Sequence, residues 1–402
     1  MNVVFLTMSR IPDFSIRSIY TDLMRKFRDE GHNVYIVTPR ERSFGDHTEL
    51  SEEDNVHLLG VRTLNLQKTS VIEKGVGQLL IESQYKRAIK RFFSDVKFDL
   101  ILYSTPPITF INVIKYLKEY SPNAKTYLLL KDIFPQNAVD LGMMRKKGVK
   151  GILYRYFRNK EKRLYAISDH IGCMSPENVE YVSKHNPEIG KERFEVAPNS
   201  IALTESCKES VDNKHIRERY GLPMDRLIFV YGGNLGKPQG IPFLMECLKV
   251  NGLRQDCHFV IVGNGTEYGK LQSWIQKNSN SCVTLIERLP KTEYDKLVQV
   301  CDVGLIMLDH RFTIPNYPSR LLNYLEYKIP VLCATDSNTD IGRIAEENGY
   351  GYWCESNSVE AFTNLVDKFI NSDRKVMGER GYEYLCGNYL VDNTYKIIIS
   401  HQ

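Results

Sequence analysis

The chain of 402 residues lacks several features that would assign it to a familiar class. Its nine cysteines are scattered, with no C-x-x-C pair and no His/Cys cluster, which argues against a disulfide framework and against a zinc site. No apolar run reaches the roughly 20 residues of a membrane-spanning helix. Met1 leads into an apolar strand pattern without the features of a signal peptide. We therefore expect free buried thiols and a cytoplasmic location.

Three motifs of nucleotide and metal chemistry are also missing. No D-x-D pair occurs, so we expect no carboxylate clamp for a divalent metal. Neither the dinucleotide fingerprint G-x-G-x-x-G nor a Walker loop ending in G-K-[ST] occurs. We predict no metal and no cofactor, and any phosphate must then be bound by backbone amides, helix N-termini and basic side chains.

The apolar pattern alternates short strand-like runs with amphipathic helices along the whole chain. Strands are predicted near residues 3–7, 33–37, 100–103, 126–130 and 170–174, and again near 227–231, 258–262, 283–286, 303–307 and 330–334. Helices are predicted at 16–30, 78–93, 109–120, 176–185, 241–250, 268–277, 292–299, 319–327 and 339–348. This alternation predicts an α/β fold with two doubly wound parallel sheets.

The length favours two domains. A polar, weakly periodic stretch at 199–225 is the predicted linker, and from Val359 onward only helices are expected. We place one domain at 1–200 and a second at 201–385, and we expect the segment 386–402 to pack back on the first. Two such domains would bind ligands at the carboxyl ends of their strands, facing a cleft.

Basic residues are unevenly distributed. Formal charge is +7 in residues 1–200 and −3 in the remainder, and residues 145–163 alone carry nine basic side chains and one glutamate. Apolar residues are interleaved among them, so this segment either rests on an anionic membrane surface or is a solvated helix with its aromatic side chains packed inward. One basic segment is a small electrostatic footprint for nucleic acid, which we do not expect as a partner.

The sequence FVYGGNLGKPQG (229–240) ends a predicted strand in glycines just before a helix. Such a loop places backbone N–H groups where a phosphate can bind, although a plain tight turn is equally compatible with the pattern. Gly263, Asn264 and Gly265 close the next strand. Two glycine turns at one sheet edge are the arrangement of a nucleotide site.

Residues 316–334, NYPSRLLNYLEYKIPVLCA, contain a helix start at Pro318 and Ser319, with Arg320 in the first turn. The helix dipole disfavours a cation there, so Arg320 suggests an anion such as a diphosphate, although it is equally typical of a solvated surface. Asn323 and Glu326 follow at i+3 and i+6, and we expect the three side chains to share roughly one face. Their polar groups suit hydroxyls of a sugar.

In the first half, Lys131 and Asp132 directly follow a predicted strand. Asp132 could orient an acceptor hydroxyl or could cap the next segment, and Lys131 could stabilise a departing phosphate. The run YSTPP (103–107) suggests a rigid turn at another strand end, with Thr105 within it. Ser9 and Arg10 follow the first strand and suit an anionic acceptor or an ordinary surface loop.

Taken together, these motifs resemble the retaining family-4 glycosyltransferases of GT-B fold, within the bacterial O-antigen and capsule branch typified by N-acetylfucosamine transferases. The resemblance spans essentially the whole chain. Its motifs occur in the expected order: KDIFPQNAVDLG (131–142), VAPNS (196–200), YGGNLGKPQG (231–240), VGNG (262–265) and PSR (318–320).

The resemblance implies two Rossmann-like domains and metal-independent transfer of a sugar, of N-acetylated hexosamine type, from a UDP donor to a polyprenyl-diphosphate-linked saccharide. The enzyme would work at the inner face of the cytoplasmic membrane, with the acceptor on residues 1–200 and segment 145–163 facing the bilayer. Predicted catalytic residues are Lys131, Asp132 and Arg320, and predicted acceptor contacts are Ser9, Arg10 and Thr105. Predicted donor contacts are Gly232, Gly233, Asn234, Leu235, Gly236, Lys237, Gln239, Gly263, Asn264, Gly265, Arg288, Leu289, Pro318, Ser319, Asn323 and Glu326.

The chain departs from the broad family at several of these positions. Asn234 and Gln239 replace the basic residues of the family's glycine loop, and Pro315 and Asn323 stand where its Glu-x7-Glu pair falls. The histidine that precedes the branch's aspartate is Lys131 here. Two alternatives therefore stay open: a UDP-sugar 2-epimerase-like GT-B enzyme, and a non-catalytic GT-B partner protein.

Overall fold

The computed structural model describes residues 1–45, 47–65, 71–148, 150–204, 212–278 and 282–402. The chain forms two compact units, residues 1–202 with 391–402, and residues 203–390. Relative to the predicted boundaries, the division falls two residues later at the first crossing and five residues later at the second. The C-terminal helix belongs to the first unit.

The first unit is built on an eight-stranded sheet in the order β3-β4-β2-β1-β5-β6-β7-β8. All neighbours run parallel except β3 and β4, which form an antiparallel edge. Central strands such as β5 are buried along their whole length, as expected for a parallel sheet covered on both faces. The strands are β1 (Asn2–Leu6), β2 (Asn33–Glu41), β3 (Glu49–Glu53), β4 (Val56–Thr63), β5 (Leu100–Ser104), β6 (Lys125–Leu129), β7 (His170–Cys173) and β8 (Phe194–Val196).

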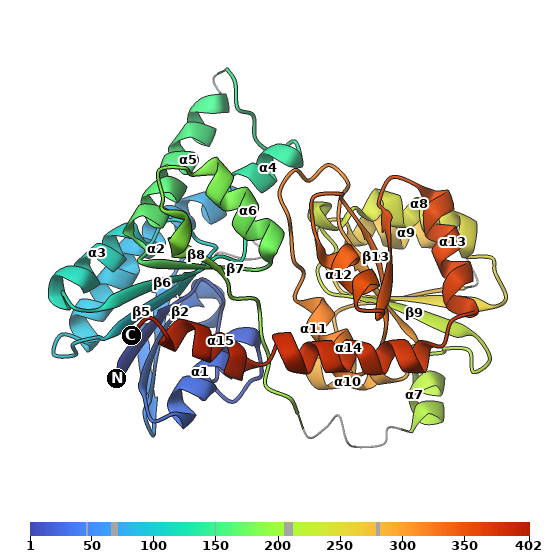
Figure 1. The fold of residues 1–402 in the computed structure, drawn as a ribbon, viewed down its shortest axis with the longest axis horizontal. Helices are drawn as coiled ribbons and strands as arrows, with labels where there is room; N and C mark the ends of the chain where they lie inside the picture. The colour runs from blue at the N-terminus through green and yellow to red at the C-terminus, as the bar shows by residue number, and fades with distance from the viewer. Residues whose placement is uncertain (46, 66–70, 149, 205–211, 279–281) are drawn as a thin grey trace. The chain divides into compact units, whose positions relative to one another are not determined.

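Helices cover both faces of this sheet. Figure 1 shows α1 and α15 on one face and α2, α3 and α5 on the other. The C-terminal helix is held against α1 by burial of Val391 and Ile398 in the core and by the edge-on contact of Tyr395 with Phe27. The helices are α1 (Ile19–Asp29), α2 (Val71–Phe92), α3 (Ile111–Tyr120), α4 (Gln136–Asp140), α5 (Lys150–Ile167), α6 (Pro176–His185) and α15 (Val391–Ile399).

The second unit has an all-parallel sheet in the order β11-β10-β9-β12-β13-β14. Numbered within the unit, this is 3-2-1-4-5-6, the order of a doubly wound dinucleotide-binding sheet. The strand order reverses between β9 and β12, which are neighbours in the sheet. The strands are β9 (Leu227–Gly232), β10 (Cys257–Val262), β11 (Val283–Ile286), β12 (Val303–Met307), β13 (Val331–Thr335) and β14 (Gly351–Glu355).

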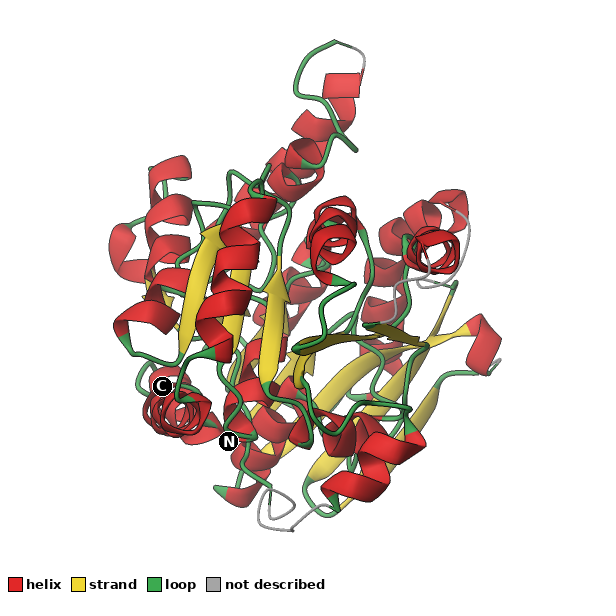
Figure 2. Cartoon of the chain, turned by 90° about the vertical axis from the view of Figure 1, so that its right-hand side faces the viewer, coloured by secondary structure: helices red, strands yellow, loops and turns green. Residues whose placement is uncertain are grey.

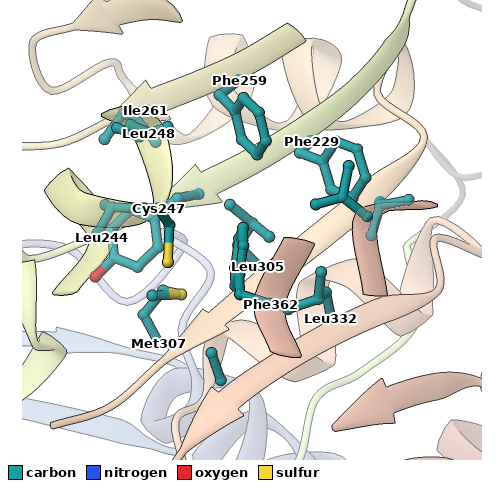
Figure 3. Close-up of a cluster of buried hydrophobic side chains, with 14 of the residues drawn as sticks. Phe229, Leu244, Cys247, Leu248, Phe259, Ile261, Leu305, Met307, Leu332 and Phe362 are labelled. Carbon is teal, nitrogen blue, oxygen red and sulfur yellow. The ribbon is translucent and has the colours of Figure 1, made fainter. Parts of the chain in front are cut away.

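In the second unit, one apolar core packs the sheet against helices. Phe229 and Phe259 stack from adjacent strands, and Leu244, Leu248 and Phe362 pack on them from α8 and α13 (Figure 3). Figure 2 shows the helices flanking the strands. The helices are α7 (Asn213–Arg219), α8 (Ile241–Asn251), α9 (Tyr268–Asn278), α10 (Lys291–Gln299), α11 (Arg320–Glu326), α12 (Ile341–Glu347), α13 (Val359–Ile370) and α14 (Arg374–Asn388).

Every strand predicted from sequence is present, with ends within about two residues except in β2, which continues four residues beyond the predicted end, but several elements were missed. The missed strands are β3, β4, β8 and β14, and the missed helices are α4, α5 and α7. β3 is an exposed edge strand rich in glutamate, so it lacks the apolar run of a buried strand. The stretch predicted as linker contains α7, which Asp212 caps through the His215 amide, and residues 205–211 lie outside the described part.

Candidate functional site

The glycine loop lies at the switch point of the second sheet. It follows β9, the strand at which the order reverses toward β12. In open α/β sheets, ligands bind outside the carboxyl ends of the strands at such a point. Arg320 begins α11, after the long connection that leaves β12. The topology therefore brings together two motifs that lie about 85 residues apart in the chain.

Most amides of the loop already have acceptors within the protein. Gly233 N donates to Val262 O (2.9 Å), Leu235 N to Asn264 O (2.9 Å) and Gly236 N to Gln239 Oε1 (3.2 Å). Gly232 N donates to the hydroxyl of Tyr324 (3.2 Å). This corrects the expectation of a row of bare N–H groups: within the described part, the Asn234 amide is the one between Gly232 and Gly236 without a protein acceptor.

The two glycine turns are packed against each other too closely for any side chain. A Cβ on Gly263 would lie 1.8 Å from the carbonyl oxygen of Gly233, and Gly263 has φ +151°. A Cβ on Gly232 would lie 1.8 Å from the Tyr294 hydroxyl. The prediction that both turns meet at one sheet edge is confirmed, and their glycines are required by this close approach.

Arg320 lies beside the loop. Its guanidinium is within 3.5–3.8 Å of the position that a Cβ on Gly233 would take. Its Cζ lies 4.3 Å from the ring centre of Tyr231, and its Nη1 is buried without a hydrogen-bond partner in the described structure. A buried guanidinium N–H without an acceptor is rare in folded proteins and suits an anionic ligand.

The other two residues of the predicted face point elsewhere. Asn323 Nδ2 donates to Asp295 Oδ1 of α10 (3.0 Å). Glu326 is 2% exposed and accepts from both N and Oγ1 of Thr204, each at 3.2 Å. Arg320, Asn323 and Glu326 therefore do not line one face toward a single ligand, because successive i+3 steps on a seven-residue helix turn each side chain toward a different neighbour.

The remaining predicted donor residues differ in their exposure to solvent. Gln239 ties the loop together by accepting from Gly236 N and from Asn234 Nδ2 (3.1 Å). Lys237 is exposed in the short 3-10 turn Lys237–Gln239 that precedes α8. Arg288 is exposed and Leu289 half-buried after β11, while Pro318 is half-buried and Ser319 exposed before α11.

The first unit has its own polar edge at its switch point between β1 and β5. Thr105, buried after β5, accepts through Oγ1 from the amides of Lys131 (3.0 Å) and Asp132 (3.3 Å). The strand ends of β5 and β6 are thus joined by one hydroxyl. Since α4 begins at Gln136 with Pro135 as its N-cap, Asp132 does not cap the following helix.

Burial shifts the pKa values of both Lys131 and Asp132 toward pH 7. It raises the pKa of the Asp132 carboxyl to about 6 and lowers the pKa of the Lys131 ammonium to about 7. Lys131 Nζ lies 3.5 Å from the carbonyl oxygen of Ala197. In the absence of a ligand, Lys131 is therefore a weaker cation than its sequence position suggested, and an anion nearby would restore its charge.

Ser9 and Arg10 follow β1 and are exposed. Arg10 stacks its guanidinium on the ring of Phe44 (3.6 Å), while Ser9 offers its carbonyl to Thr38 Oγ1 (2.8 Å). Sequence reasoning missed Tyr20 of α1, whose pKa burial raises to about 12 and which the Asp132 charge also affects. Tyr20 belongs to no motif, so no sequence signal could have found it.

The basic segment forms a loop and α5 with an exposed apolar side. Ile152 is 60% exposed, Leu153 52% and Tyr156 44%. Exposed basic side chains accompany them, among them Arg145, Lys146, Lys147, Arg155 and Arg163. Tyr154 and Phe157 are half-buried, and Phe157 packs edge-on against Phe134. The alternative in which the aromatic side chains pack inward therefore holds for these two residues and not for Tyr156.

No helix in the described part is long and apolar enough to cross a membrane. No group of three or more His, Cys, Asp or Glu side chains in that same part is arranged to hold a metal ion.

The residues that form this site match a known protein family. Residues 212–384 match the family described as Glycosyl transferases group 1. The matched range contains the glycine loop, the switch point and Arg320. This range of the second unit is therefore similar to group 1 glycosyltransferases, and the match supports a transferase.

Two curated relatives carry glycosyltransferase names. The probable glycosyltransferase WbjE of Pseudomonas aeruginosa is 23% identical over 326 residues, which cover 80% of this chain and 78% of the relative. The putative colanic acid biosynthesis glycosyl transferase WcaI of Escherichia coli strain K12 is 24% identical over 251 residues. That match covers 59% of this chain and 58% of the relative.

Solved structures share the fold along the whole chain. Sucrose-phosphate synthase from Thermosynechococcus elongatus superposes with a TM-score of 0.76 at 13% identity, covering all of this chain and 98% of the other. Anabaena Alr3699/HepE in complex with UDP has a TM-score of 0.65 at 12% identity, covering 100% and 99%. Together with the two parallel α/β units, these likenesses confirm the predicted GT-B fold.

Proposed function

We propose that this protein transfers a sugar from UDP to a lipid-diphosphate-linked saccharide during assembly of a capsular or O-antigen polysaccharide. The observation that carries the proposal is Arg320, a guanidinium with a buried, unpartnered N–H beside the glycine loop in the range similar to group 1 glycosyltransferases. UDP in the HepE complex and colanic acid biosynthesis in the name of WcaI support the nucleotide and the pathway class.

On the donor side, the diphosphate would be bound by charge and not by a row of amides. Arg320 would donate to it, with Lys237 and the Asn234 amide as further donors, because the other loop amides have partners in the protein. The bond from the sugar carbon to the diphosphate oxygen breaks while the acceptor oxygen bonds to that carbon from the same side. The departing phosphate oxygen takes the acceptor proton, so the configuration is retained and no metal is required.

On the acceptor side, Asp132 would orient the reacting hydroxyl. Its carboxyl is charged above pH about 6, and its backbone is fixed by Thr105 Oγ1. Lys131 would regain its proton beside an anionic acceptor, since only burial lowers its pKa to about 7. Ser9 and Arg10, exposed after β1, would contact the acceptor at the same strand edge.

A lipid-linked acceptor requires that the first unit reach a membrane. The exposed apolar residues Ile152, Leu153 and Tyr156 among exposed lysines and arginines suit the anionic inner face of a cytoplasmic membrane. Apolar side chains would enter the headgroup region while the basic side chains contact lipid phosphates. The same unit carries the proposed acceptor edge.

Turnover with defined substrates tests the proposal. Purified protein is incubated with UDP-linked N-acetylated hexosamines, with and without a polyprenyl-diphosphate saccharide, and UDP release and glycolipid product are measured. We expect release only with acceptor, a product of retained anomeric configuration by NMR, and no effect of EDTA. Conversion of donor without acceptor would indicate the epimerase-like enzyme, and no binding or turnover of any donor would indicate the non-catalytic partner.

Vesicle co-sedimentation tests the membrane contact separately. We expect binding to vesicles containing phosphatidylglycerol that weakens with salt and is lost in a variant combining Lys146→Glu, Lys147→Glu and Leu153→Asp. Leu253→Asp is the matched control, because Leu253 is an equally exposed leucine (64%) in the second unit. Salt-insensitive binding, or equal loss in both variants, would contradict the assignment.

A further inference from the structure

Tyr231 contacts both parts of the candidate donor site. It is fully buried in β9, one residue before the first glycine of the loop. Its ring lies 4.3 Å from Cζ of Arg320, and its hydroxyl donates to the carbonyl of Asn234 at 2.7 Å. One side chain therefore touches both the cation and the loop.

Arg320 has few other interactions to fix its position. The hydroxyls of Tyr231, Tyr294 and Tyr324 are among the groups that act on its charge, and its Nη1 has no hydrogen-bond partner in the described structure. The electron-rich face of a tyrosine ring attracts a guanidinium but uses none of its N–H groups. The contact with Tyr231 thus holds the cation while leaving Nη1 available for an anion.

The hydroxyl of Tyr231 constrains the loop itself. By engaging the Asn234 carbonyl, it fixes the peptide that follows the crowded Gly233–Gly263 contact. Asn234 is also the loop residue whose amide has no acceptor among the described residues. A fixed Asn234 and a fixed Arg320 would present their donors to the same ligand with little reorganisation.

We infer that Tyr231 is the positioning residue of the donor site, which holds Arg320 by its ring and the glycine loop by its hydroxyl before a nucleoside diphosphate binds. This inference rests on the proposed function. Tyr231 begins the motif YGGNLGKPQG but is not among the predicted site residues, because an aromatic residue at the end of a buried strand is ordinary core.

A series of ring substitutions measures the contact directly. Position 231 is changed to Phe, to fluorinated Phe with one, two or three fluorines, and to Leu, and UDP affinity is measured by calorimetry. Fluorination withdraws charge from the ring face without changing its shape, so we expect log Kd to rise in proportion to the number of fluorines. We expect about a three- to thirtyfold loss in Tyr231→Leu. Most of the affinity should remain in Tyr231→Phe.

Two controls separate positioning from general folding. Uridine, followed by ligand-observed NMR, should bind equally to all members of the series, because it carries no phosphate. In an Arg320→Ala background the fluorine dependence should vanish. The Phe series keeps the ring in place, so it remains informative even if Tyr231→Leu does not fold.

Each remaining outcome has a distinct meaning. UDP affinity that is flat across the Phe series, or uridine affinity that falls in parallel with it, overturns the positioning role and leaves the proposed function intact. Absence of UDP binding by the unaltered chain overturns the proposed function and, with it, this inference.

Discussion

The two units share a doubly wound architecture but differ in the chemistry of their strand ends. In the second unit, the switch point carries closely packed glycines and a half-buried arginine whose Nη1 is buried without a partner in the described structure. In the first unit, the corresponding edge carries Thr105 beside Lys131 and Asp132, and burial moves the pKa values of the latter two toward neutrality. One edge suits a fixed anion, and the other suits a hydroxyl that must be oriented.

The surfaces of the units differ in the same direction. The first unit has exposed Ile152 and Leu153 in a strongly basic helix, while the second has the near-neutral composition of an ordinary globular domain. The difference teaches that one doubly wound architecture can carry different chemistry at its strand ends.

The largest effect is expected at the anion edge. Arg320→Ala should raise the barrier to turnover by about 2–4 kcal/mol, comparable to removing one preorganised donor from a charge-stabilising site. Steady-state UDP release with acceptor present measures it. Arg343→Ala, an exposed arginine in α12, is the control and should keep full activity; equal losses in both would remove the special role of Arg320.

At the acceptor edge, Asp132→Asn should stabilise the first unit at pH 8 by up to about 3 kcal/mol. Burial raises the folded-state pKa from 3.8 to about 6, so the cost of the charged form begins above pH 3.8 and is complete above pH about 6. The cost shrinks as pH falls and is about half as large at pH 5. Thermal unfolding between pH 5 and 8 measures it, with the exposed Asp95→Asn as control.

The same titration predicts the pH dependence of turnover. If Asp132 acts in its charged form, kcat/KM should fall below pH about 6 as the carboxyl takes up a proton. This acidic limb should be absent from the residual activity of Asp132→Asn. A limb that persists unchanged in that variant would assign the titration to another group.

The packing of the glycine turns predicts a smaller, structural effect. Gly263→Ala should destabilise the second unit by about 1–3 kcal/mol, because its Cβ would overlap the Gly233 carbonyl, and should weaken UDP binding with it. Unfolding and calorimetry measure both. Unchanged UDP affinity in Gly263→Ala would show that UDP binding does not require close contact between the two turns.

The smallest effect is expected for Gly269→Ala, which adds the same methyl group as Gly263→Ala at an uncrowded position. Gly269 lies within α9, and a Cβ added there would meet no atom within 4 Å. Gly269→Ala should therefore stabilise the second unit by about 0.5–1 kcal/mol through helix propensity. Its UDP affinity should not change. Thermal unfolding of the two glycine variants side by side gives opposite signs if the account of the turns is correct.

The sequence predicted the strands and the glycine turns because buried parallel strands have continuous apolar runs that end in turn residues. It could not predict which loop amides are free, since Val262, Asn264 and Tyr324 accept hydrogen bonds from three of them and lie in elements distant in the chain. The prediction that Arg320, Asn323 and Glu326 share one face was wrong for a similar reason. Helical spacing alone does not identify the residues that each side chain contacts, here Asp295 for Asn323 and Thr204 for Glu326.

The central claim is that the second unit binds a nucleoside diphosphate through Arg320. Calorimetry of UDP, GDP, ADP, CMP and NAD with the purified chain and with Arg320→Ala tests it most directly. The account predicts selective binding of UDP that is weakened at least about tenfold in the variant, which corresponds to one charge-assisted contact. Binding of none of these nucleotides, or UDP binding that is unchanged in Arg320→Ala, would contradict it.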